Sequence, residues 1–418
     1  MANEHLDHRG RHRVAITGIG LKTPAGQDVE TFWSTLNANR SVAAELQRFD
    51  PSELPVRFGC EVLDYDVTQY IGPKEARRLD RVTHLGLGAA ADALADAGEL
   101  RNNPARSAVI MGTGIGGLNT LEEQTIVYKD KGPNRVSPFF VPMMMANATA
   151  GNIAMQFGWT GPNLCIATAC AASAHAIGEA ARLVREGTAD VVMTGGSEAC
   201  LTPVAISAFG RMTALSNRND APELASRPFD ADRDGFVMGE GAAALVLEPW
   251  ERAVARGARI HGEVIGYGRN ADAFHITAPS PGGEGASACM QLALDDAGLS
   301  PTAIGHVNAH GTSTPLNDAA EAEAIRKVFG GDNAVPVTST KGVTGHLIGA
   351  AGATEAIAAV LAMARGSVPP TANLERIGDD IMLDVVHDAP RELAAAPSLS
   401  NSFGFGGHNA TLVFAPGA

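Results

Sequence analysis

The chain has 418 residues, of which 45% are hydrophobic and 19% are charged. These proportions are typical of soluble globular proteins, and the length favours two domains or one duplicated domain. The formal net charge of −14 argues against nucleic-acid binding, because proteins of that class usually present a basic face.

Residues 1–12 are polar and lack the apolar run of a signal peptide. We expect them to form a disordered tail, and we expect the protein to be cytoplasmic. The cysteine pattern agrees with a reducing compartment, because it contains neither a CxxC pair nor metal-ligand spacing. The five cysteines are Cys60, Cys165, Cys170, Cys200 and Cys289. The sequence therefore predicts no metal site.

Residues 13–20 predict a short buried strand that ends in Gly18-Ile19-Gly20. A Gly-x-Gly turn after a strand is a weak sign of nucleotide binding, but no third spaced glycine follows and Pro24 interrupts the expected helix. We therefore predict no nucleotide site here.

From residue 90 onward a pattern of helix, strand and glycine turn occurs twice. In the first copy a helix at 91–98 precedes a strand at 108–114, and in the second a helix at 291–298 precedes a strand at 306–312. Each copy continues with an alanine-rich helix and reaches another glycine-rich strand end. Because the order and the ends match, we interpret the chain as two copies of one α/β unit packed face to face.

The duplication divides the chain into halves at residues 13–260 and 261–418. A pseudo-twofold arrangement brings corresponding loops together. It therefore predicts that Cys170, His310 and His346 lie at equivalent strand or helix ends and face one cavity.

Cys170 is the first candidate for chemistry, because small residues surround it and an alanine-rich helix follows it. A thiol at a helix N-terminus lies near the positive end of the helix dipole, so we expect a lowered pKa and a nucleophilic role. The alternative is a buried structural cysteine, which is common in alanine-rich cores.

The longest apolar segment spans residues 345–364 and contains His346 and Glu355. Polar side chains and several glycines in such a segment predict a buried core helix and not a membrane span.

Four motifs, taken together, resemble the β-ketoacyl-acyl-carrier-protein synthases. They are Thr168-Ala169-Cys170, Asn308-Ala309-His310-Gly311-Thr312-Ser313-Thr314-Pro315, Lys341-Gly342-Val343-Thr344-Gly345-His346, and residues 401–409. Their order and spacing are similar to those of the elongating, type II enzymes, from about residue 13 to the C-terminus. The resemblance implies a thiolase-like fold, in which a duplicated α/β unit forms a five-layer αβαβα sandwich.

The same resemblance implies roles for individual residues. Cys170 would hold the acyl chain as a thioester, and His310 and His346 would stabilise the enolate left by malonyl decarboxylation. The backbone N–H groups of Cys170 and Phe405 would form an oxyanion hole. The other implied roles are support of the histidines by Lys341, Glu355 and Asp318, an aromatic gate at Phe403 and Phe405, pantetheine binding by Thr312, Thr314 and Thr277, and an acyl pocket at Leu121, Met143, Met144 and Met145.

An acyl carrier protein is the partner that the resemblance implies, together with a second copy of the chain in a homodimer. Carrier proteins are acidic, so a protein of net charge −14 needs a local basic surface to meet one. The candidate docking residues are Lys74, Arg77, Arg78 and Arg135. No metal, organic cofactor, membrane or nucleic acid is expected.

Related enzymes are separated by single positions. Thiolases carry a second catalytic cysteine near the C-terminus, but no cysteine follows Cys289 here. Initiating synthases have asparagine where this chain has His346. Chain-length factors lack the nucleophile, whereas Cys170 is present. We therefore predict an elongating 3-oxoacyl-carrier-protein synthase of fatty acid biosynthesis. Two alternatives stay open, namely a ketosynthase of a polyketide or other specialised pathway and a non-elongating partner subunit.

Overall fold

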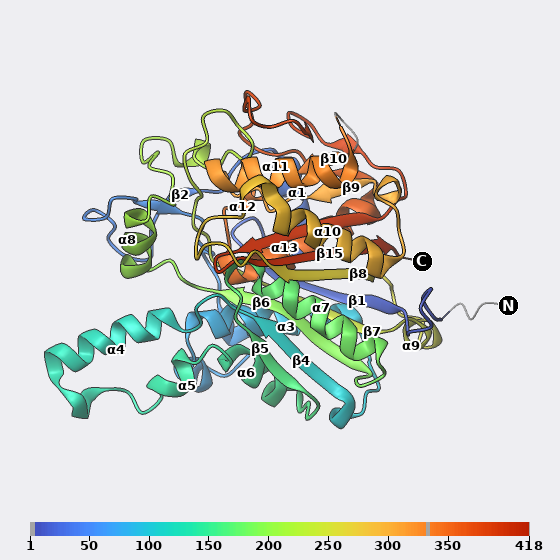
Figure 1. The fold of residues 1–418 in the computed structure, drawn as a ribbon. Helices are drawn as coiled ribbons and strands as arrows, with labels where there is room; N and C mark the ends of the chain where they lie inside the picture. Colours follow the sequence, from blue (N-terminus) through green and yellow to red (C-terminus); the bar gives the residue numbers. More distant parts are fainter. Residues whose placement is uncertain (1–4, 332–334, 418) are drawn as a thin grey trace.

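The computed structural model describes residues 5–331 and 335–417 (Figure 1). The first half of the chain gives five strands to the main sheet: β1 (Val14–Lys22), β4 (Ser107–Gly112), β5 (Asn163–Ile166), β6 (Val191–Glu198) and β7 (Gly241–Pro249). Its helices are α1 (Val29–Asn37), α2 (Pro73–Ala76), α3 (Arg81–Ala97), α4 (Leu118–Lys131), α5 (Phe140–Met144), α6 (Ala148–Phe157), α7 (Ala172–Arg185), α8 (Pro203–Arg211) and α9 (Trp250–Ala255). A separate small pair joins β2 (Ala44–Glu45) to β3 (Phe58–Gly59).

The second half gives six strands to the same sheet: β8 (Gly262–Ala271), β9 (His306–Asn308), β10 (Pro336–Thr338), β12 (Asp384–Val385), β14 (Ser398–Gly404) and β15 (His408–Pro416). Its helices are α10 (Glu284–Ala297), α11 (Pro315–Phe329), α12 (Lys341–Thr344) and α13 (Ala351–Arg365). A second small pair joins β11 (Ser367–Val368) to β13 (Arg391–Glu392). The boundary between the two sets of strands lies between α9 and β8.

The strand order of the main sheet is β12-β10-β9-β14-β15-β8-β1-β7-β6-β4-β5. Outward from the middle, the first half reads β1-β7-β6-β4-β5 and the second reads β8-β15-β14-β9-β10. Each strand of the first half therefore has a counterpart at the same place in the second, and β12 adds one further strand beyond β10. β1 pairs antiparallel with β8 where the halves join. The duplication that the sequence repeat predicted is confirmed.

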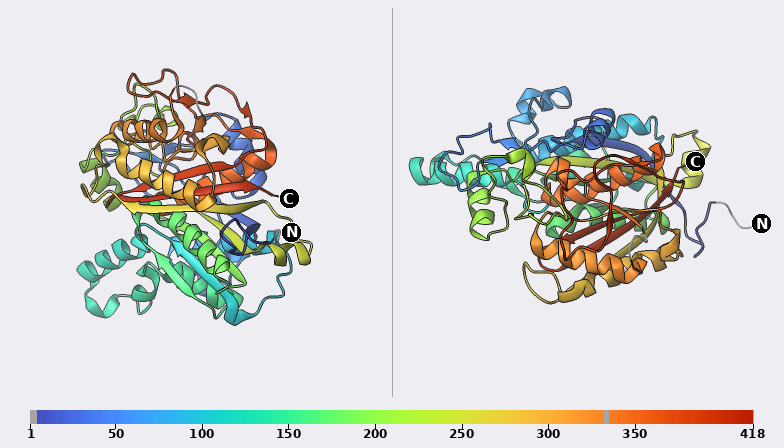
Figure 2. Two further views of the ribbon diagram at one scale, coloured as in Figure 1. Left: turned by 45° about the vertical axis from the view of Figure 1, so that its right-hand side comes forward. Right: turned by 90° about the horizontal axis from the view of Figure 1, so that it is seen from above.

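The helices form three layers around the two half-sheets (Figures 1 and 2). α7 and α13 pack against each other in the middle, with α7 on β4 and β6 and α13 on β14 and β15. α3 covers β1 and β7 on one outer side, and α10 covers β8 and β15 on the other. The predicted five-layer thiolase-like sandwich is confirmed, and its middle layer contains the helices that follow Cys170 and His346.

Close packing of strand on helix explains the Gly-x-Gly that resembled a nucleotide motif. A Cβ atom at Gly20 on β1 would lie 1.9 Å from the carbonyl oxygen of Ala89 on α3. At the matching place in the second half, a Cβ at Gly268 on β8 would lie 2.1 Å from the carbonyl oxygen of Cys289 on α10. Glycine is needed at both positions because helix and strand backbones touch.

Within the described residues, one helical stretch, Ile348–Arg365, has the length and hydropathy of a membrane span. It is 89% buried inside the protein, so it is a core helix, as the sequence predicted. Its apolar character follows from its place between two half-sheets.

The prediction of a disordered N-terminal tail is wrong for residues 5–12. Leu6 bridges to His12, and the guanidinium groups of Arg9 and Arg11 bind the carboxylate of Asp296 at the end of α10. The same carboxylate also pairs with Arg185, whose side chain is buried. A polar composition predicted disorder, but these ion pairs order the segment; residues 1–4 lie outside the described residues.

Candidate active site

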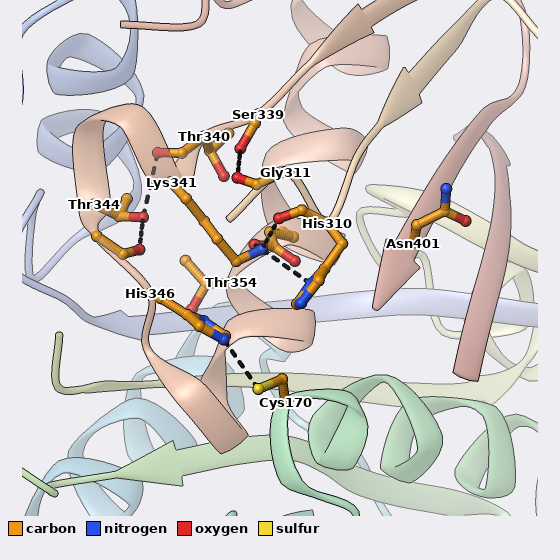
Figure 3. Close-up of polar contacts among 12 residues, drawn as sticks. Cys170, His310, Gly311, Ser339, Thr340, Lys341, Thr344, His346, Thr354 and Asn401 are labelled. Atoms are coloured by element: carbon orange, nitrogen blue, oxygen red, sulfur yellow. Dashed lines mark hydrogen bonds and ion pairs between the residues drawn. The ribbon is translucent and has the colours of Figure 1, made fainter. Parts of the chain in front are cut away.

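A cavity of about 410 Å³ is lined by residues from both halves of the described chain. Cys170, His310 and His346 all line it, as the pseudo-twofold arrangement predicted. Figure 3 shows the three side chains converging from separate segments. The sequence therefore placed these residues correctly at one cavity.

Cys170 lies in a tight turn between β5 and α7. The preceding residue, Ala169, has φ +49°, a conformation that costs free energy for any residue with a Cβ. Cys170 itself is in a single 3₁₀ turn directly before α7 begins at Ala172. The turn aims the sulfur at the cavity and at His346, whose Nε2 lies 3.0 Å from Sγ.

Hydrogen bonds at Nδ1 determine the tautomer of both histidines. The Ile348 N–H donates to Nδ1 of His346 at 3.3 Å, and the Lys341 ammonium donates to Nδ1 of His310 at 3.3 Å. A neutral imidazole that accepts at Nδ1 carries its proton on Nε2. Both rings therefore present an Nε2–H donor.

Both imidazoles are neutral at physiological pH. Burial lowers the pKa of His310 well below its usual value, and the nearby Lys341 charge and His346 add to this effect. Burial and Lys341 likewise hold the pKa of His346 well below its usual value. The two rings meet edge to face with centroids 5.3 Å apart. A pair of neutral N–H donors can stabilise a developing oxyanion without transferring a proton to it.

A buried ion pair supports His310 from behind. The Lys341 ammonium bonds to the Glu355 carboxylate and donates to the His310 carbonyl oxygen at 2.5 Å. Burial raises the pKa of Glu355 to about 7, and the Lys341 charge opposes this rise. The structure thus brings together the predicted pair and the histidine, so that loss of either partner would leave the other buried and unpaired.

Two further carboxylates hold the backbone around His310. Glu321 on α11, which sequence reasoning missed, accepts the N–H groups of His310 and Gly311 at 2.7 Å each. Asp318, one turn earlier, accepts from the N–H groups of Phe229 and Ser313. The sequence did contain a signal for Glu321. It lies three residues after Asp318, among alanines, on a helix that follows His310.

Phe403 and Phe405 both line the cavity at the end of β14. The Phe403 ring packs edge on against His310, with centroids 5.9 Å apart. The backbone N–H of Phe405 donates toward the Cys170 sulfur. The structure therefore places this N–H where the implied oxyanion hole requires a donor.

The three threonines implied to bind pantetheine also line the cavity. The hydroxyls of Thr312 and Thr314 are hydrogen-bonded to each other at 2.9 Å. Thr277 lies across the opening, in the loop between β8 and α10. Ala278, the next residue, lines the same opening but has no hydroxyl that could bind the pantetheine arm.

The implied acyl-pocket residues are not among those that line the cavity of the single described chain, so their assignment to an acyl pocket stays a prediction. Leu121 lies on α4 and Met143, Met144 and Met145 lie on or directly after α5, in an arm that stands off the body of the molecule in every view (Figures 1 and 2). The apolar wall is formed instead by Ile115, Phe209, Met212, Phe236 and Ile348. The Gly117 N–H donates to the Met144 carbonyl, which links this segment to the chain two residues after Ile115.

The implied docking residues form an exposed basic surface from two segments. Lys74 on α2 and Arg77 and Arg78 directly after it are exposed, and so is Arg135. The Arg78 guanidinium lies over the ring of Phe139, 4.6 Å from its centroid. This contact joins α2 to the segment that carries Arg135.

The distances alone would allow Cys170, His310 and His346 to share a metal ion, since their ligand atoms lie within 4.8 Å of one another. Among the described residues this is the one such group of three or more. Both Nε2 atoms carry protons, however, so their lone pairs are not free for ligation. The donor set fits hydrogen bonding to an oxyanion better than metal binding.

The expected low pKa of Cys170 is corrected by the structure. Burial raises the pKa of the thiol to about 12, and the Lys341 charge and the Phe405 N–H only partly oppose this. We therefore expect the rate of alkylation by iodoacetamide to rise about tenfold per pH unit between pH 7 and pH 9, because the thiolate is the reactive form. Mass mapping of the Cys170 peptide at each pH measures this rate.

A plateau of the rate beginning near pH 7 would contradict the raised pKa and favour the sequence-based expectation. Cys200 provides the control, because it is fully buried and does not line the cavity. It should remain unlabelled across the same range.

Comparison with known proteins agrees with this site. The model of the β-ketoacyl synthase N-terminal domain matches residues 11–253, and that of the C-terminal domain matches residues 261–375. A 3-oxoacyl-[acyl-carrier-protein] synthase 2 from Synechocystis sp. is 49% identical over 407 residues, which cover 97% of this chain and 98% of the relative.

Two solved structures have nearly the same fold. A β-ketoacyl synthase from Burkholderia phymatum superposes with a TM-score of 0.91 at 36% identity, covering 97% of this chain and 99% of that one. A type II polyketide ketosynthase in complex with its acyl-carrier protein superposes with a TM-score of 0.90 at 30% identity and the same coverage. The chain therefore belongs to the β-ketoacyl synthase family and is a condensing acyltransferase.

Proposed function

We propose that this condensing enzyme of fatty acid synthesis extends a carrier-bound acyl chain, with Cys170 as the acyl carrier and His310 and His346 as the enolate-stabilising pair. The single observation that carries this assignment is the convergence of one sulfur and two Nε2–H donors in one cavity. In the first half-reaction the Cys170 sulfur attacks the acyl thioester. The thiol proton ends on the leaving pantetheine sulfur, and the N–H groups of Cys170 and Phe405 stabilise the tetrahedral oxyanion.

In the second half-reaction a malonyl thioester loses CO₂, and the electron pair of the broken C–C bond forms an enolate. The Nε2–H groups of His310 and His346 hold the enolate oxygen, so its carbon stays nucleophilic and attacks the acyl group on Cys170. Collapse of the new tetrahedral intermediate breaks the C–S bond. The product is two carbons longer and the Cys170 sulfur is released.

An acyl carrier protein is the proposed donor of both substrates. The basic surface of Lys74, Arg77, Arg78 and Arg135 supplies charge opposite to that of an acidic carrier. The threonines at the opening are suited to bond the amides of a pantetheine arm. Among similar proteins, a polyketide ketosynthase was solved with its own acyl-carrier protein.

We expect the double variant Lys74→Glu with Arg77→Glu to lower kcat/KM for carrier-bound substrates by about tenfold or more, because reversed charge weakens electrostatic steering. The loss should lie mainly in KM and should shrink at high salt. Steady-state condensation assays with carrier-bound and free pantetheine thioesters measure it.

The free pantetheine substrates provide the internal control, since they do not need the basic surface. Arg101→Glu provides a matched surface variant, because the Arg101 side chain is 80% exposed and lies outside this surface. An equal loss with both substrate types would contradict docking at these residues.

A homodimer is the proposed assembly. β5 ends the main sheet, so one of its edges is unpaired within the described chain, and such edges invite pairing with another strand. Leu164 on β5 and Met155 on the neighbouring α6 are 52% and 73% exposed. Apolar side chains beside an open edge fit contact with a second copy.

We expect the unmodified protein to sediment at twice the chain mass of 43.2 kDa. The double variant Leu164→Arg with Met155→Glu should sediment at the mass of one chain, because dimerisation would bury the new charges at the interface. Leu292→Glu is the control, since Leu292 is an exposed leucine on α10 and should leave the dimer intact. A monomeric unmodified protein would contradict the proposal.

A further inference from the structure

Glu198 is a buried carboxylate with no part in the half-reactions described above. It is the last residue of β6, and its side chain is fully buried. Its partners are neutral groups: one carboxylate oxygen accepts the N–H of Gly114 at 2.6 Å and of Gly349 at 3.1 Å, and the other accepts the hydroxyl of Thr113 at 3.1 Å. A buried carboxylate is costly, and Glu198 forms no ion pair with any described residue, so its presence at this place calls for a function.

The contacts of Glu198 join the two halves of the chain at the active site. Thr113 and Gly114 lie at and beyond the end of β4, whereas Gly349 lies in the turn between His346 and α13. Gly114 lines the cavity, and so does Ile348, the neighbour of Gly349. The Glu198 carboxylate therefore links a segment of the first half to a segment of the second half at the wall of the cavity.

The turn that Glu198 holds is strained. Ile348 has φ +47°, which is rare for a β-branched residue and costs of the order of 1–3 kcal/mol. Such a conformation persists only where the surroundings fix it. The hydrogen bond from the Gly349 N–H to Glu198 is one such restraint, immediately after the strained residue.

The strained turn also determines the tautomer of His346. The Ile348 N–H is the group that donates to Nδ1 and so keeps the ring proton on Nε2, the atom facing Cys170. If the turn relaxes, the Ile348 N–H leaves Nδ1, and the ring can carry its proton on either nitrogen. One of the two donors for the enolate oxygen is then lost for part of the time.

We propose that Glu198 is a positioning residue for decarboxylation, which acts by holding the Ile348–Gly349 turn and, through it, the Nε2–H tautomer of His346. This inference rests on the proposed role of His346. Acyl transfer relies chiefly on the Cys170 and Phe405 N–H groups, and on His346 only through its contact with the sulfur, so it should depend on this turn much less than decarboxylation does. The two half-reactions should therefore respond differently to changes at Glu198.

The test compares Glu198→Ala, Glu198→Asp and Glu198→Gln with the unmodified enzyme. We expect Ala and Asp to slow malonyl-thioester decarboxylation by about 30-fold, an effect typical of residues that orient a reacting group from behind it. The decarboxylation rate of Glu198→Gln should stay within about threefold of that of the unmodified enzyme. The Gln amide oxygen can accept the N–H groups of Gly114 and Gly349, and its amide nitrogen can donate to Thr113. Acyl loading of Cys170, followed by intact mass, should change less than threefold in all three.

Thr113→Val is the matched control, because it removes the bond to the other carboxylate oxygen and leaves the bond to Gly349. It should decarboxylate at nearly the unmodified rate. Normal decarboxylation in Glu198→Asp, or parallel loss of both half-reactions in the folded variants, would overturn the proposal. If Glu198→Ala does not fold, the variants Glu198→Asp and Glu198→Gln test the role of Glu198. If the unmodified enzyme itself does not decarboxylate a malonyl thioester, the proposed function fails and not this inference.

Discussion

Replacement of Cys170 by alanine abolishes acyl loading and lowers condensation by about 10⁴-fold or more, because no other group at the site can form the thioester. Cys170 is the one cysteine that lines the described cavity. Decarboxylation of a malonyl thioester should persist in this variant, since both Nε2–H donors remain. Intact-mass analysis after mixing with acyl-carrier proteins of increasing chain length measures loading, and release of CO₂ measures decarboxylation.

Cys200→Ala is the control, because Cys200 is buried away from the cavity and its loss should leave loading intact. The chain length at which loading of the unmodified enzyme stops also reports the size of the pocket walled by Phe209 and Phe236. An adduct on the Cys170→Ala variant would remove Cys170 from its assigned role. No adduct on the unmodified enzyme with any chain would favour a non-elongating partner subunit.

Removal of the His310 ring has the second-largest expected effect. We expect His310→Ala to slow decarboxylation by about 10²- to 10³-fold, the cost of one lost oxyanion donor, while acyl transfer to Cys170 continues. His346→Ala should lose decarboxylation to a similar extent. Acyl transfer should slow somewhat more in this variant, because His346 Nε2 also contacts the sulfur. Separate assays of the two half-reactions measure both effects.

His387→Ala is the matched control, because His387 lies outside the cavity and its loss should affect neither half-reaction. Loss of acyl transfer in His310→Ala with decarboxylation intact would reverse the roles assigned here. The rate of decarboxylation should not fall between pH 8 and pH 6. Both histidines stay neutral over this range, because their pKa values lie well below the usual value.

The sequence was a reliable guide wherever a local pattern carried the information. The repeated order of helix, strand and glycine turn predicted the duplication, because each copy of the unit must bury the same faces. The motifs around Cys170, His310, Lys341 and His346 predicted the residues that converge at the cavity and at the buried ion pair. Each of these motifs is a short run of neighbouring residues, whereas the contacts between the motifs come from the fold.

Contacts between segments far apart in the sequence decided the rest. Burial between the half-sheets raises the pKa of Cys170, although its position before α7 predicted the opposite. Asp296 orders residues 5–12, although their composition predicted disorder. Glu321 and Glu198 act through carboxylate bonds to the backbone of another segment, and such bonds leave no sequence motif.

The sequence by itself thus determined the family and the duplicated fold, and it predicted the groups that line the cavity, because these depend on residue type and on periodicity along the chain. Only the tertiary structure decided that Glu321 holds the backbone at His310, which tautomer the two histidines adopt and which side chains wall the cavity. These properties depend on desolvation and on hydrogen-bond partners that only folding brings together. They exist only once the two halves have packed together.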